Sequence, residues 1–121
     1  MGINGVCLAG RRILVVEDNL LIALTMARLF RTKGAEIIGP VGSVKDALAL
    51  VNNYKRFDGA VLDVNLRGAA AYAIVDVLRG KSVPTVFVTG YDKASIDPRY
   101  ADVPCLQKPV TVERLIGALF G

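Results

Sequence analysis

The alternation of short apolar runs with amphipathic segments constrains the fold of this chain more than any other feature. The β-branched run Arg12–Glu17 predicts a buried strand. In the segment after Asn19, apolar residues recur at the spacing of one helix face, and Gly34 ends the helix. The residues of that face are Ile22, Met26, Leu29 and Phe30. The same alternation predicts further strands at 36–39, 59–62, 84–88 and 103–106, and further helices at 44–51, 70–79 and 111–120.

Strands that alternate with helices predict an α/β fold in which helices cover both faces of a parallel sheet. Five such units are too few for an eight-stranded barrel, which leaves an open, doubly wound sheet. The fourth connection departs from the pattern, because residues 93–96 supply about one helical turn and Pro98 prevents its continuation. We therefore expect a fourth helix that is short or irregular.

The composition narrows the range of functions. The 121 residues fit one domain, which we assign to 12–121, with an N-terminal extension at 1–11. Histidine is absent, which excludes histidine metal sites and histidine general bases. The net charge of +4 comes from basic residues spread along the chain, so we expect no direct nucleic-acid binding. No apolar run reaches the ~18 residues of a membrane helix, and the first ten residues are not a secretory signal. We expect a cytoplasmic protein that does not bind membranes.

Polar side chains follow four of the predicted strands. Glu17 and Asp18 end the first, Asp63 ends the third, Thr89 and Gly90 end the fourth, and Lys108 and Pro109 follow the fifth. Taken singly, each has a structural explanation, such as a helix cap for Asp18 or a turn for Thr89. In an open α/β sheet, however, the carboxyl ends of the strands meet at one edge.

Three carboxylates at one edge repel each other unless a cation lies among them. Hard oxygen ligands suit Mg²⁺, or Mn²⁺, rather than Zn²⁺. Such a cation, with an ammonium and a hydroxyl close by, is an arrangement typical of phosphoryl transfer.

These residues, in this order at the ends of the strands, resemble the receiver domain of two-component response regulators. The resemblance spans about 12–120 and implies a flavodoxin-like sheet with the strand order 2-1-3-4-5. Within the family, Asp63-Val64-Asn65-Leu66 and Thr89-Gly90-Tyr91 resemble an alphaproteobacterial branch of single-domain receivers.

The resemblance also implies residue roles. Asp63 would accept the phosphoryl group, Asp18 would bind Mg²⁺ directly, and Glu17 would bind it mainly through water. Asp63 would itself also bind Mg²⁺, and a further protein ligand would be the backbone carbonyl of Asn65. Thr89 would follow the phosphoryl group and Lys108 would pair with it, with a cis peptide between Lys108 and Pro109. The partners implied are a histidine kinase or a histidine phosphotransfer protein, and an unknown downstream protein.

The sequence departs from the family pattern near the switch. Cys105 stands where receivers usually carry an aromatic residue, and Tyr91 is the aromatic that we expect to replace it. Gly90 lies between Thr89 and Tyr91, and Asn65 and Tyr91 occupy positions that tune the lifetime of the phosphoryl state in the family. Gly68 can supply the turn that a Pro would otherwise set.

Leu20, Leu21 and Leu24 lie away from the predicted core face of the first helix. We expect this patch, together with Pro109, to dock the phosphodonor. The alternative is that helix ends tolerate exposed leucine, or that the predicted helical phase is one residue off.

Four functions remain open at this point. The first is a phosphoryl-accepting switch that is not an enzyme. It would act either alone or as a segment of a longer regulator, and as a monomer or weak dimer. The second is a degenerate receiver that binds a protein without phosphorylation. The third, a phosphohydrolase of the haloacid dehalogenase type, requires a second Asp where this chain has Asn65. The fourth, a nucleotide- or flavin-binding module, lacks its glycine-rich motifs.

Overall fold

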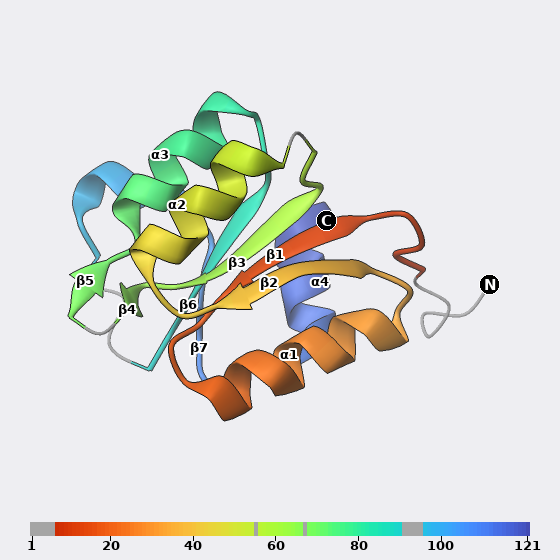
Figure 1. The fold of residues 1–121 in the computed structure, drawn as a ribbon. Coiled ribbons are helices and arrows are strands. Elements are labelled where there is room, and N and C mark those ends of the chain that lie inside the picture. Colours follow the sequence, from red (N-terminus) through yellow and green to blue (C-terminus); the bar gives the residue numbers. More distant parts are fainter. Residues whose placement is uncertain (1–6, 55, 67, 91–95) are drawn as a thin grey trace.

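The computed structural model describes residues 7–54, 56–66, 68–90 and 96–121, which form a sheet between two layers of helices (Figure 1). The main sheet has five parallel strands in the order β2-β1-β3-β6-β7. This is the expected order 2-1-3-4-5, because β4 and β5 form a separate hairpin. The strands of the main sheet are β1 (Arg12–Val16), β2 (Glu36–Val41), β3 (Gly59–Asp63), β6 (Thr85–Thr89) and β7 (Cys105–Gln107).

Helices cover both faces of the sheet, as its apolar strands require. Figure 1 shows α1 (Leu20–Thr32) and α4 (Val112–Phe120) on one face, and α2 (Val44–Asn53) and α3 (Tyr72–Gly80) on the other. Each face has its own core layer. Phe30 and Leu115 belong to the layer under α1 and α4, and Phe87 and Leu78 to the layer under α2 and α3.

The core face of α1 differs from the predicted one. Met26 and Phe30 are buried as expected, but Leu29 is 36% exposed, and the alanines Ala23 and Ala27 face the core in its place. The prediction for Leu29 was wrong because a pattern of large apolar residues overlooks small ones. Ala23 and Ala27 are buried and define the core face together with Met26 and Phe30, and Leu29 lies outside that face.

Most segments differ from their predicted bounds by one or two residues, and β2, α3 and β7 are examples. Strand β2 continues through Pro40 to Val41, because Val41 pairs with Val16. Helix α3 begins at Tyr72 rather than at residue 70, because Ala69–Ala70 (β5) pairs with Asn65–Leu66 (β4). Strand β7 begins two residues later than predicted.

The fourth connection contains no α-helix among its described residues, which are 90 and 96–104. A 3₁₀-helix, η3 (Pro98–Tyr100), occupies part of it, and the Asp97 carboxylate caps this helix by accepting from the backbone N–H of Arg99. The turn predicted at 93–96 lies almost wholly outside the described residues.

The N-terminal segment that the structure describes packs against the domain. Leu8 is 2% exposed in the core layer of α1 and α4, and its backbone N–H donates to the carbonyl of Lys33. In the described part of the chain, no helix combines the length and apolar character needed to cross a membrane.

Candidate phosphoryl-transfer and cation site

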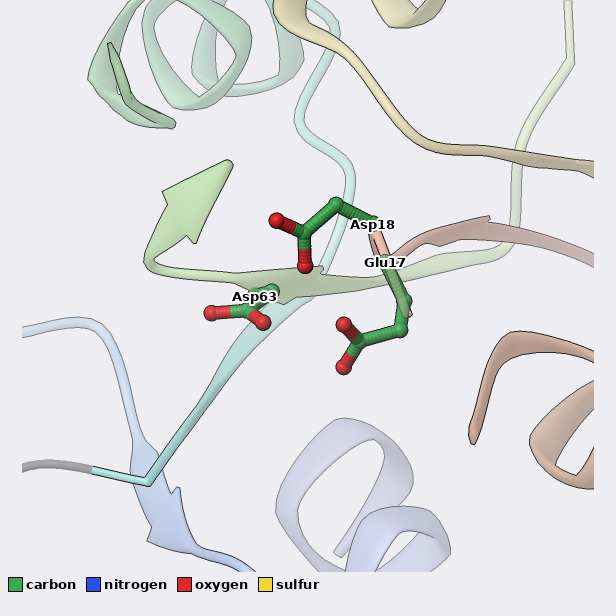
Figure 2. A group of neighbouring side chains, drawn as sticks. All are labelled: Glu17, Asp18 and Asp63. Carbon is green, nitrogen blue, oxygen red and sulfur yellow. The ribbon is translucent and has the colours of Figure 1, made fainter. Parts of the chain in front are cut away.

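Three carboxylates meet at the carboxyl edge of the sheet, as the strand order predicts. Oxygen atoms of Glu17, Asp18 and Asp63 lie within 4.8 Å of one another (Figure 2). Glu17 and Asp18 directly follow β1, and Asp63 ends β3, the strand beside it. Glu17 is 3% exposed and Asp63 is 8% exposed, so their charges are largely withdrawn from water.

Lys108 supplies positive charge to this cluster. Its ammonium Nζ lies 2.6 Å from Glu17 Oε1 and 2.9 Å from Asp63 Oδ2. The backbone N–H of Lys108 donates to the carbonyl of Thr89, which holds the end of β7 beside the end of β6. The peptide between Lys108 and Pro109 is cis, as the resemblance implies. One lysine thus pairs with two carboxylates from two different strands.

Burial and charge pairing shift two pKa values in the site. Burial raises the pKa of Glu17, against the opposing effects of the Lys108 ammonium and the Asn19 N–H, and the Asp63 carboxylate raises it further. Burial alone would lower the pKa of Lys108, but its contacts with Glu17 and Asp63 outweigh burial and raise it. Lys108 therefore remains charged at neutral pH.

The chemistry of the donors fits a divalent cation. The carboxylate oxygens are the hard ligands that Mg²⁺ prefers. Glu17 Oε1 is buried, and its contact in the described part of the chain is the Lys108 ammonium at 2.6 Å. Such an oxygen has capacity for a further positive partner. The residues present therefore fit a magnesium site.

The segment after Asp63 orients its carboxylate. The backbone N–H of Asn65 donates to Asp63 Oδ1 over 3.0 Å, so that each oxygen of Asp63 has a partner, with Lys108 on Oδ2. Asn65 itself begins the β4–β5 hairpin. Gly68 of the same hairpin and Gly90 after β6 line a cavity of about 460 Å³ at the site, into which Asp63 and Asn65 also face.

The switch residues are only partly described. Thr89 is 3% exposed at the end of β6, and Gly90 is exposed beside it. Tyr91 lies outside the described residues. Cys105 is half-buried on β7, where it pairs in register with Phe87 and packs against the core layer of α2 and α3.

An aromatic group that the sequence analysis missed lies close to Cys105. The rings of Tyr72 and Tyr100 stack with their centroids 4.3 Å apart, and Phe87 meets Tyr72 edge-on. The Tyr72 hydroxyl accepts from the backbone N–H of Asp97. No local pattern could have revealed this stack, because its members come from three elements far apart in sequence.

Asn19 is a second residue whose role was missed. Its backbone N–H donates to Glu17 Oε2, and its side chain caps α1 by accepting from the N–H of Ile22. An asparagine directly before a helical pattern is the typical signal of such a cap.

The leucine patch is exposed as predicted. Leu20, Leu21 and Leu24 are 69%, 75% and 50% exposed on α1. Beside them, an apolar groove of about 440 Å³ runs between α1 and α4, with Leu21 and Pro109 among its walls. The groove joins the patch to the Lys108–Pro109 end of the site.

Comparison with known proteins agrees with this geometry. The sequence model for the response regulator receiver domain matches residues 13–120, nearly the whole chain. The chain belongs to the response regulator receiver domain family.

This receiver resembles several proteins in detail. It is 37% identical to SdrG of Sphingomonas melonis Fr1, whose solution structure it matches with a TM-score of 0.79 over 92% of this chain and 97% of that one. A structure described as the BeF3-activated conformation of SdrG matches with 38% identity and a TM-score of 0.78, over 93% and 98% of the two chains. The transcriptional regulatory protein PdtaR of Mycobacterium tuberculosis is 29% identical over 113 residues, which are 90% of this chain and 55% of PdtaR. The receiver thus spans about half the length of that relative.

Proposed function

We propose that this receiver is a phosphoryl-accepting switch in which Asp63 takes a phosphoryl group from a phosphohistidine of a histidine kinase or a phosphotransfer protein. The observation that carries the proposal is the contact of Lys108 Nζ with both Glu17 and Asp63, within a cluster of three carboxylates. A structural ion pair needs one carboxylate, whereas this arrangement keeps a buried nucleophile beside a cationic group.

The proposed step is a substitution at phosphorus. A carboxylate oxygen of Asp63 forms a bond to phosphorus as the bond from phosphorus to the histidine nitrogen breaks, and the imidazole leaves with the electron pair of that bond. Lys108 then pairs with an oxygen of the transferred group, and Thr89 donates its hydroxyl to another. Mg²⁺, held by Asp18, Asp63 and the Asn65 carbonyl and through water by Glu17, would neutralise charge on the phosphoryl oxygens.

A change in the conformation of the residues near Thr89 would signal the phosphoryl state to a partner. We propose that Thr89 and Gly90 move towards the phosphoryl group and that Tyr91 takes the role usually played by an aromatic at position 105. The half-buried Cys105 is too small to turn into the site as an aromatic ring would. Asn65, beside Asp63, would tune how long the phosphoryl group survives. The output is a change in the affinity for a downstream protein rather than turnover of a substrate, so the chain would not act as an enzyme.

We further propose that the patch of Leu20, Leu21 and Leu24 docks an apolar helical surface of the phosphodonor, with Pro109 at its edge. The support is the exposure of the three leucines and the position of Leu21 in the wall of the groove that reaches Lys108 and Pro109. We propose that the receiver meets this phosphodonor in the cytoplasm, as a monomer or weak dimer and without binding nucleic acid.

The test is intact-protein mass after incubation with acetyl phosphate and Mg²⁺. We expect one phosphoryl adduct, which is lost in the Asp63→Asn variant and in the presence of EDTA. Asp63→Asn keeps the shape of the side chain while removing the negative charge and the nucleophile. An adduct that persists in Asp63→Asn would place the acceptor elsewhere. A folded wild-type protein that forms no adduct with acetyl phosphate or with a phosphorylated phosphotransfer protein would contradict the proposal.

The second candidate is a receiver that binds its partner without phosphorylation. The observation that favours it is Cys105, which stands at the position where the usual coupling to Thr89 requires an aromatic side chain. Equal partner affinity of the phosphorylated and unphosphorylated protein would select this candidate.

A further inference from the structure

We propose that the hairpin turn at Gly68 positions the backbone carbonyl of Asn65 for the divalent cation, and so sets the cation affinity of the site. Gly68 lines the same cavity as Asp63 and Asn65 but does not belong to the acidic cluster. The inference deepens the proposed function, since it rests on the assignment of that carbonyl as a ligand.

The register of the hairpin fixes the direction of the Asn65 backbone. Leu66 pairs with Ala69 and Asn65 with Ala70, which leaves a two-residue connection. In such a hairpin the closing pair exchanges its hydrogen bonds, and the next pair directs its N–H and C=O groups away from the partner strand. The N–H of Asn65 obeys this rule, because it donates to Asp63 Oδ1. The carbonyl of Asn65 leaves on the same edge of β4, which is the edge of the acidic cluster.

The side chain of Asn65 holds the turn while its backbone faces the site. Asn65 Oδ1 accepts from the N–H of Gly68 over 2.9 Å. Leu66, which is 2% exposed, anchors the hairpin in the core layer of α2 and α3. The next backbone bond, from the N–H of Ala71 to the carbonyl of Val64, closes the hairpin against α3. The direction of the carbonyl is therefore determined at both ends of β4.

The turn requires a left-handed residue at position 68. Gly68 has φ +86°, a conformation that L side chains rarely adopt. A Cβ built on Gly68 meets nothing within 4 Å, so a substitution there would act through backbone conformation and not through collision. Asparagine tolerates this region far better than alanine does. This contrast makes the proposal testable with two substitutions at one position.

The experiment is a calorimetric titration of the full chain with Mg²⁺ alone, on wild type, Gly68→Ala and Gly68→Asn. We expect Gly68→Ala to weaken Mg²⁺ binding about tenfold, the lower bound for losing a group that orients a metal ligand. Gly68→Asn should stay within about twofold of wild type because it keeps the turn. Gly80→Ala is the matched control, since a Cβ there also meets nothing within 4 Å and the φ of Gly80 is not positive.

Two results would overturn the inference. Wild-type Mg²⁺ affinity in Gly68→Ala would show that the turn does not set the direction of the Asn65 carbonyl. Equal weakening by Gly68→Asn and Gly68→Ala would show that the conformation of residue 68 is not the cause. Should Gly68→Ala fail to fold, Asn65→Ala removes the Oδ1 acceptor without imposing φ, and full Mg²⁺ affinity in that variant would equally contradict the inference.

The readout separates this inference from the proposed function. A protein that binds Mg²⁺, loses affinity in Gly68→Ala and yet accepts no phosphoryl group would uphold the inference and contradict the proposed function. A protein that forms the Asp63 adduct with unchanged Mg²⁺ affinity in Gly68→Ala would do the reverse.

Discussion

The two flanks of the acidic site are built in opposite ways. On one flank, α1 and α4 leave three leucines exposed beside an open apolar groove. On the other, α3 and η3 are joined by the stacked rings of Tyr72 and Tyr100 and by hydrogen bonds to Asp97 and Asp76. Apolar surface is thus exposed to solvent on the α1–α4 flank and buried within the molecule on the α3–η3 flank.

The contrast separates two tasks that one domain must perform. The α1–α4 flank contributes apolar area that stabilises nothing in the isolated chain, so it is available to a partner. We expect the packing of the α3–η3 flank to respond to the state of the site, because η3 follows Thr89 in the chain. A partner would therefore meet the first flank, and conformational change would pass through the second.

The largest expected effect is on stability. Tyr100 is 7% exposed between Tyr72 and the side chains of Arg79 and Arg99. Tyr100→Ala should lower the free energy of unfolding by about 3 kcal/mol, because it leaves a cavity and ends the stack. Urea unfolding measures this. Leu21→Ala on the other flank, where the side chain is 75% exposed, should change it by less than about 0.5 kcal/mol. Similar losses of unfolding free energy in the two variants would contradict the contrast between the two flanks.

The next effect is on phosphoryl transfer. Leu20→Glu combined with Leu24→Glu should slow transfer from a histidine kinase or phosphotransfer protein about tenfold, because charge in an apolar contact costs at least about 1.4 kcal/mol. The rate with acetyl phosphate should be unchanged. Ala49→Glu combined with Ala73→Glu adds the same charges at exposed positions on α2 and α3 and serves as the control. Loss of rate with both donors would count against docking at this flank.

A smaller effect is expected at the hydroxyl of Tyr72. Tyr72→Phe keeps the ring and removes the acceptor of the Asp97 N–H, which lies 2.8 Å from it. We expect the free energy of unfolding to fall by about 1 kcal/mol, the net value of one partly buried hydrogen bond. Tyr54→Phe alters a ring that is 39% exposed and should have a smaller effect. If Tyr72→Phe leaves the free energy of unfolding unchanged, the ring stack alone joins α3 to η3.

The subtlest effect is on titration. The hydrogen bond to the Asp76 carboxylate, together with burial, raises the pKa of Tyr100 above the ordinary value of 10.0. Below pH 10 the tyrosine is protonated in both the folded and the unfolded chain, so stability is unaffected. As the pH rises above 10, the unfolded chain ionises first, and the stability from this contact is lost until the pH passes the folded pKa. Asp76→Asn should lower the pKa of Tyr100, as followed by NMR of ring-labelled tyrosine. An unchanged pKa would locate the cause in burial alone.

Much of the fold and the centre of the site could be predicted from the sequence. Glu17 and Lys108 directly follow short strands and Asp63 ends one, and parallel strands bring their carboxyl ends to one edge. Local pattern and simple geometry are sufficient for that inference. The cis Lys108–Pro109 peptide required the family resemblance in addition.

The features that escaped prediction depend on packing or on very short segments. The exposure of Leu29 accompanies the burial of Ala23 and Ala27 on the core face of α1, which a search for large apolar residues does not detect. The β4–β5 hairpin has two residues in each strand, too few for any periodicity. The Tyr72–Tyr100 stack joins residues that only the tertiary fold brings together. The roles of Tyr91, Cys105 and the leucine patch stay predictions.

The position of Lys108 has a consequence for how the cell can use this chain. A cluster of three acidic groups would ordinarily make folding dependent on a supply of divalent ions, because mutual repulsion opposes its assembly. The Lys108 ammonium is covalently part of the chain and meets two of those groups, so a counter-ion is present from the moment of synthesis. We therefore expect a newly made molecule to fold in a magnesium-poor medium, so that fluctuations in the ion supply would alter its readiness to react rather than its abundance.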